Sequence, residues 1–178
     1  MDSQELILGR LSTILGETDK AYATKLRTLV DGAGRIFIGG AGRSGLVSRF
    51  FAMRLVHSGY QVNMVGEIVT PAIKAGDLLV IISGSGGTET LMPLVKKAKS
   101  VGAKFCVVSM KSKSAMQEVA DLNVQIGNDN SFPATHGMPM GAQFELSSLL
   151  FLEAVIADIV NAKNLTEEGM RAIHANLE

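Results

Sequence analysis

The chain has 178 residues and balances 17 lysines and arginines against 17 aspartates and glutamates, which is typical of one neutral domain, expected here over residues 1–178. This balance excludes a general attraction to nucleic acid or to an anionic membrane surface. One cysteine and three scattered histidines form no zinc-type cluster, and the polar, acidic N-terminus has no signal-peptide pattern, so we expect a cytoplasmic protein without a bound metal.

Helical and strand-like patterns alternate along the chain. Apolar spacing predicts a long or broken leading helix over residues 4–30. Strands are expected at 35–38, 61–65, 78–82, 104–108 and 122–126, and helices at 44–58, near Pro71, at 88–101 and from Ser114, where Gln117 completes a capping box. The pattern predicts an α/β fold, a three-layer αβα sandwich with a five-stranded, flavodoxin-like parallel sheet at about 35–126, whose ligands bind at the carboxyl ends of the strands.

Closing helices are expected over about 141–176, and the first of them, about 141–162, is apolar around most of its circumference. One side of a sheet cannot bury all of these side chains, so this helix is expected to lie between its own domain and another subunit. A helix buried entirely within one domain is the alternative.

The turn Ser83-Gly84-Ser85-Gly86-Gly87-Thr88 joins the most apolar strand to the helix predicted after it. Glycines allow close backbone approach and positive φ, hydroxyls donate hydrogen bonds, and a helix N-terminus attracts anions. The turn lacks the lysine of a nucleoside triphosphate loop, so a phosphate monoester is the expected ligand. The alternative is a turn that only caps the next helix.

A second glycine turn, residues 40–45, matches GxGxxG after the first strand. A dinucleotide site would use its three glycines for the pyrophosphate and Glu67 for the ribose. Arg43 and Ser44 place donors where that fingerprint uses bare backbone, and Glu67 comes late. The dinucleotide interpretation is therefore the weaker alternative.

Together, Gly-Ala-Gly-Arg-Ser-Gly and Ser-x-Ser-x-x-Thr resemble the sugar isomerase (SIS) domain family over nearly the whole chain. Segments 52–60, 65–67 and 139–145 resemble more narrowly its 6-phospho-3-hexuloisomerase members. The resemblance implies interconversion of a 3-hexulose 6-phosphate and fructose 6-phosphate in formaldehyde fixation, a homotetramer, and no metal or organic cofactor. A different phosphosugar isomerase or a phosphosugar-binding regulator of the same fold remains an alternative.

The resemblance also assigns residues. It implies that Glu145 is the proton acceptor and that the two turns hold the phosphosugar. His136, in the irregular loop before residue 139, and Gly87 depart from the family pattern. The expected substrate-binding residues are Gly42, Arg43, Ser44, Glu67, Ser83, Gly84, Ser85, Gly86, Gly87 and Thr88.

Two side chains are the candidates for proton transfer. Glu145 falls in the first turn of the closing helix, where an ordinary helix-start carboxylate is the alternative role. His57 titrates near neutrality, but it lies about 20 Å along its helix from Ser44, so it would have to serve a neighbouring subunit's site. A packed structural histidine is the alternative there, and His174 is expected at the surface.

Overall fold

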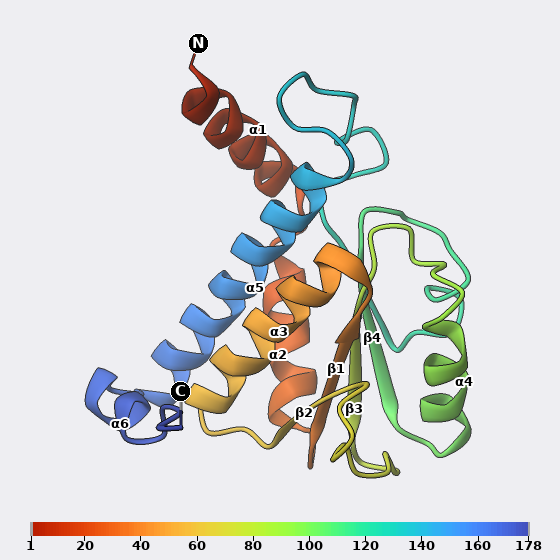
Figure 1. Ribbon diagram of the computed structural model, residues 1–178, viewed down its shortest axis with the longest axis vertical. Coiled ribbons are helices and arrows are strands. Elements are labelled where there is room, and N and C mark those ends of the chain that lie inside the picture. Colours follow the sequence, from red (N-terminus) through yellow and green to blue (C-terminus); the bar gives the residue numbers. More distant parts are fainter. Residues whose placement is uncertain (1, 178) are drawn as a thin grey trace.

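The computed structural model describes residues 2–177 and contains a five-stranded, all-parallel sheet (Figure 1). The strand order is β2-β1-β3-β4-β5, which is the flavodoxin-like order. The predicted sheet is therefore confirmed, and each predicted strand lies within two residues of its observed bounds. The strands are β1 (Ile36–Gly40), β2 (Val62–Met64), β3 (Leu78–Ile82), β4 (Lys104–Ser109) and β5 (Leu122–Gln125).

Helices cover both faces of the sheet (Figure 1). One face carries α1 (Ser3–Glu17), α2 (Ala21–Asp31), α3 (Gly42–His57) and α5 (Ala142–Lys163), and the other carries α4 (Met92–Ser100). The short α6 (Glu167–Ala172) lies beyond the C-terminal end of α5. No helix within residues 2–177 is long and apolar enough to cross a membrane.

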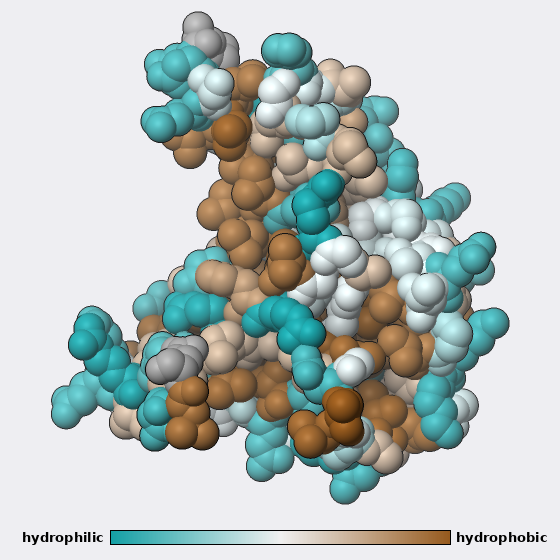
Figure 2. Space-filling view, viewed as in Figure 1, coloured by the Kyte–Doolittle hydropathy of each residue, from teal (hydrophilic) through white to brown (hydrophobic). Residues whose placement is uncertain are grey.

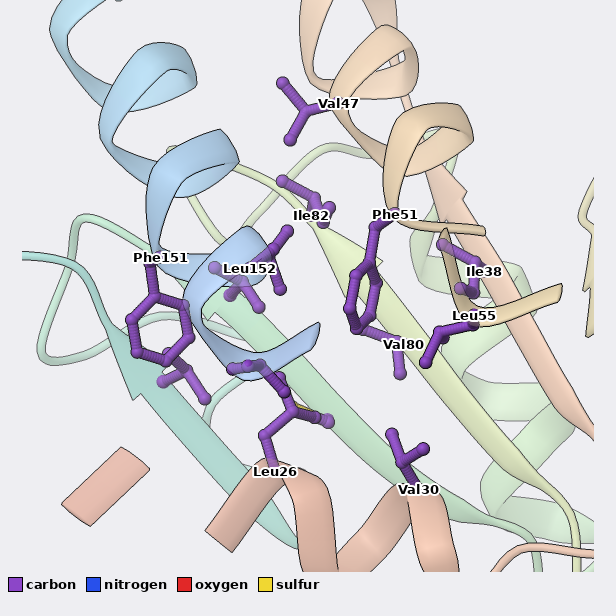
Figure 3. Packing of buried hydrophobic residues seen from close by; sticks show 14 of the residues in the cluster. Leu26, Val30, Ile38, Val47, Phe51, Leu55, Val80, Ile82, Phe151 and Leu152 are labelled. Atoms are coloured by element: carbon purple, nitrogen blue, oxygen red, sulfur yellow. The ribbon is translucent and has the colours of Figure 1, made fainter. Parts of the chain in front are cut away.

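Side chains of successive strand residues point to opposite faces of the sheet, so each face has its own hydrophobic core. Val80 and Ile82 point toward α3 and α5, where they meet Phe51 and Leu152 (Figure 3). Their neighbours Leu79 and Ile81 point to the opposite face and pack with residues of α4. Because both faces are buried, β3 is a continuous apolar run, as expected for a central parallel strand.

The leading helix takes the broken form, one of the two that the sequence predicted: α1 and α2 are separate, and the Asp19 carboxylate accepts a hydrogen bond from the Ala21 amide at 2.9 Å. Two other helix predictions are wrong, and local contacts explain the differences. The helix expected from residue 88 begins at Met92, because Pro93 occupies its first turn. In place of the helix expected near Pro71 the chain is irregular, and Thr70 Oγ1 donates to the Met64 carbonyl at 2.6 Å.

The capping box expected at Ser114 does not form. The Gln117 backbone amide donates to Ser114 Oγ at 3.4 Å, but the Gln117 side chain donates its Nε2 proton to the Lys111 carbonyl, and its Oε1 does not accept from the Ser114 amide. Without the reciprocal bond the segment makes only a turn, and the chain continues into β5.

The two glycine turns leave the sheet side by side. Gly40, the last residue of β1, is paired with Ile82, the last residue of β3. From β1 the chain moves outward to β2 and then returns to the other side of β1 as β3. The direction of winding therefore changes between β1 and β3. Ligands of open α/β sheets bind at this switch point.

Candidate active site

The loop after β3 is closed by its own hydroxyl groups. Ser83 Oγ and Thr88 Oγ1 lie 3.0 Å apart, and the Gly86 amide donates to Ser83 Oγ at 3.2 Å. Within residues 2–177, the amides of Ser85, Thr88, Glu89 and Thr90 donate to no other group. The loop therefore presents backbone donors to an anion at the carboxyl end of the sheet.

The loop after β4 supports residues 83–88, which we call the phosphate loop after their predicted ligand. Ser109 Oγ and the Met110 amide both donate to the Gly84 carbonyl, at 3.0 and 3.2 Å, and the Met116 amide donates to the Gly86 carbonyl at 3.1 Å. Gly86 has a φ of 63°, and a Cβ on it would overlap the Ser114 side chain. Glycine is required there for both reasons.

Ser83→Ala, Ser85→Ala and Thr88→Val are each expected to raise KM for a phosphosugar roughly 10- to 100-fold, because a hydrogen bond to a charged group contributes about 1.5–3 kcal/mol. Steady-state kinetics measure the effect. Ser100→Ala, on the exposed C-terminal turn of α4, is the matched control and should leave KM unchanged. Unchanged KM in all three loop variants would show that the phosphate binds elsewhere.

The turn after β1 is tightly packed. A Cβ on Gly40 would lie 2.6 Å from Ser48 Oγ and 2.9 Å from the Ser44 carbonyl oxygen, so only glycine fits. Gly42 begins α3 with a φ of 56°. This geometry brings Ser44, in the first turn of α3, to the same edge as the phosphate loop.

The structure joins Arg43 of this turn to Glu145. Arg43 Nε donates to Glu145 Oε2 at 2.7 Å, and its Nη2 donates to the Met140 carbonyl. The hydrogen bond and then the charge of Glu145 raise the pKa of Arg43 above its usual value. Glu145 is 17% exposed, and its Oε1 accepts no hydrogen bond within residues 2–177. One carboxylate oxygen is thus held in place while the other is available to accept a proton.

The first turn of α5 lies against the phosphate loop. A Cβ on Gly84 would come within 3.1 Å of the Phe144 ring, which is buried beside it. Glu145 is the next residue along α5, so packing of Phe144 sets the place of the carboxylate relative to the loop. The Glu145 carboxylate and the predicted phosphate loop therefore lie at the same edge of the sheet.

Glu67, expected at the substrate, is engaged elsewhere in this chain. Its Oε1 lies 2.7 Å from Arg49 Nη1 on α3, and both side chains are about half exposed. The carboxylate that a dinucleotide ribose would need is therefore paired with an arginine. Whether Glu67 contacts a phosphosugar stays a prediction.

A polar network missed at the sequence level holds the loop before α5. Arg10 of α1 donates to Gln143 Oε1 at 3.1 Å and to the Ser131 carbonyl at 2.8 Å, while Gln143 Nε2 donates to the Pro133 carbonyl at 3.0 Å. This loop lines a cavity of about 450 Å³ that includes His136. The sequence carries no local signal for the network, because its partners are far apart in the chain.

His57 lies at the opposite end of α3 from the phosphate loop. As the last residue of a 16-residue helix it is about 22 Å along the helix from Gly42, given the helix rise. There its ring stacks on His174, which is exposed as expected, but the contact between them was not foreseen. The structure therefore brings Arg43, Glu145 and the phosphate loop together and leaves His57 apart from them.

In the part of the chain described here, no three His, Cys, Asp or Glu side chains are arranged to hold a metal ion. The groups that the structure brings together at this edge include the hydroxyls and backbone amides of the phosphate loop, the Arg43 guanidinium and the Glu145 carboxylate. Such a set can bind a phosphorylated, hydroxylated molecule and move a proton on it.

Comparisons with known proteins identify the family of this chain. The SIS domain model matches residues 29–152. A 3-hexulose-6-phosphate isomerase of Methylomonas aminofaciens is 68% identical over 98% of both chains, and one of Bacillus subtilis (strain 168) is 37% identical over 97% of this chain and 95% of its own.

The fold is also that of solved structures. A protein of Methanococcus jannaschii, for which the function of 3-hexulose-6-phosphate isomerase has been inferred, superposes with a TM-score of 0.89 at 34% identity, and the match covers 100% of both chains. The family model and the relatives span the turns and the start of α5 that form the site, so this chain belongs to the SIS domain family.

Proposed function

We propose that this chain, as a single SIS domain, interconverts D-arabino-3-hexulose 6-phosphate and fructose 6-phosphate. The observation that supports the proposal is the close approach of the Phe144 ring to Gly84 of the phosphate loop, because Glu145 follows Phe144 and lies at the edge of the sheet where we expect the phosphosugar to bind. The 68% identical isomerase of Methylomonas aminofaciens supports this choice of substrate.

The reaction moves a carbonyl between C2 and C3 and needs one base. From fructose 6-phosphate, Glu145 Oε1 removes the proton on C3, and the electrons form the cis-enediol. The proton then returns from Glu145 to C2 while C3 becomes the carbonyl. The hydroxyl proton of O3 is transferred to O2 over the same reaction, so no atom is gained or lost. A single carboxylate that reaches both carbons from one face can perform both transfers.

Arg43 has a clear task in this scheme. Its guanidinium holds Glu145 Oε2 and the Met140 carbonyl, so it fixes the base relative to the start of α5. About half of the Arg43 side chain is exposed, so it is also accessible to a substrate. Ser44 and the phosphate loop then hold the substrate by hydrogen bonds.

The proposed assembly is a homotetramer with sites shared between subunits. Figure 2 shows the α5 side hollowed between α1 and α6, with hydrophobic side chains along its upper part. A cavity of about 590 Å³ between α3 and α5 is mostly apolar. Exposed apolar side chains that α3 and α5 contribute are Leu46, Phe50, Met53, Val56, Leu146 and Leu150. A second copy covering them would remove this surface from water.

Such an assembly also gives His57 its role. In its own chain it lies about 20 Å along α3 from Ser44, too far to touch a sugar bound there. Reaching a neighbour's site, it would move protons between the sugar oxygens or assist ring opening. We further propose that the enzyme works in the cytoplasm, in formaldehyde fixation by the ribulose monophosphate pathway.

The test is an assay of the purified chain against pentose, hexose and heptose phosphates. Turnover is expected with fructose 6-phosphate and the 3-hexulose 6-phosphate, and rates at least about a hundredfold lower with aldose phosphates. Comparable turnover of an aldose phosphate would favour another SIS isomerase. Binding of a phosphosugar without turnover would favour a regulator.

A further inference from the structure

The exposed His174, just after α6, is placed against the proposed catalytic histidine. The centroids of the His57 and His174 rings are 4.8 Å apart, and their planes differ by 22°. His174 Nδ1 donates to the Ala175 carbonyl at 2.9 Å, which sets the orientation of its ring. No residue of α6 is buried, so core packing does not explain why this segment lies here.

The two imidazoles face a cavity of about 500 Å³ between the ends of α3 and α5 and the α6 segment. The arginine and glutamate side chains that line this cavity form ion pairs with one another. Arg54 of α3 binds Glu153 of α5 with two bonds of 2.7 and 3.0 Å, and Arg171 of α6 pairs with Glu167. The two imidazoles are the other titratable side chains that line this cavity.

We propose that His174 is a positioning residue, which by stacking holds the His57 imidazole in the orientation that serves the neighbouring subunit's site. The inference rests on the proposed shared site. The last side-chain torsion of a histidine has broad energy wells, so a contact against the face of the ring narrows its orientation. Proton transfer loses rate steeply when the group is misplaced. The α6 segment would then be part of the catalytic apparatus.

The test separates stacking from folding. His174→Ala is expected to lower kcat about tenfold with KM for fructose 6-phosphate unchanged, because the phosphate loop is untouched. His174→Phe keeps a flat ring and should restore kcat to within about twofold of the wild type. Asn176→Ala, exposed near the same terminus, is the control and should behave as wild type.

Wild-type kcat in His174→Ala, a loss that appears in KM alone, or failure of His174→Phe to restore kcat would overturn the inference. Melting temperatures check that the variants fold, and His174→Leu, which keeps bulk without a flat ring, replaces His174→Ala if that variant does not. A reduced kcat in His57→Ala beside a wild-type His174→Ala defeats this inference alone. A wild-type kcat in His57→Ala defeats the proposed shared site as well.

Discussion

Glu145→Gln is expected to abolish turnover, with kcat lower by about a thousandfold or more, while affinity for fructose 6-phosphate stays within about tenfold. The amide keeps the shape of the side chain and can still accept from Arg43, but it cannot take a proton from carbon. Steady-state rates and calorimetric titration with fructose 6-phosphate measure the two quantities separately.

Asp158→Asn is the matched control, since it makes the same change on an exposed position of the same helix. It should retain wild-type rates. If Glu145→Gln turns over at the rate of Asp158→Asn, another group is the base. If it loses affinity by a large factor as well, Glu145 is a binding group rather than the proton acceptor.

His57→Ala and the double variant Ser85→Ala/Thr88→Val are each expected to be nearly inactive alone and to complement each other when mixed. In a shared site, one subunit supplies the phosphate loop and another supplies His57. Random reassembly of equal amounts would leave about one quarter of the sites with both intact halves. Activity should therefore return to about a quarter of the wild-type value, and only after the subunits have dissociated and reassembled.

The readout is activity before and after dissociation, with hybrid formation verified by native mass spectrometry. Hybrids that form but stay inactive would contradict a shared site. So would a monomer with full activity, and His57 would then be a packed structural residue at the end of α3.

Much of the fold was predictable because buried parallel strands leave a simple pattern. The bounds of β3 match the prediction in full, since an apolar run bounded by Asp77 and Ser83 can only be one strand. Helix starts were less predictable, because one proline or one side-chain bond decides them. Because Pro93 occupies its first turn, α4 begins at Met92 and not at residue 88. The Gln117 side chain bonds the Lys111 carbonyl, so it does not complete the predicted capping box.

The site was predictable in its local parts and not in its long-range ones. The phosphate loop and the helix-start position of Glu145 are local features. The ion pair between Arg43 and Glu145 joins residues 102 apart in sequence, and the stack of His57 on His174 depends on where α6 returns. Residue chemistry predicts a phosphate ligand, whereas the identity of the sugar rests on the family.

The position of solvent hydrogen in recovered substrate tests the central claim most directly. The wild-type chain is incubated with fructose 6-phosphate in D₂O, and the sugar is analysed by NMR. Transfer of a carbonyl between C2 and C3 by a carboxylate base predicts deuterium at C3 of fructose 6-phosphate, and its loss in Glu145→Gln. Deuterium at C1 would identify an isomerase that forms an aldose phosphate, and no incorporation together with no turnover would contradict an isomerase altogether.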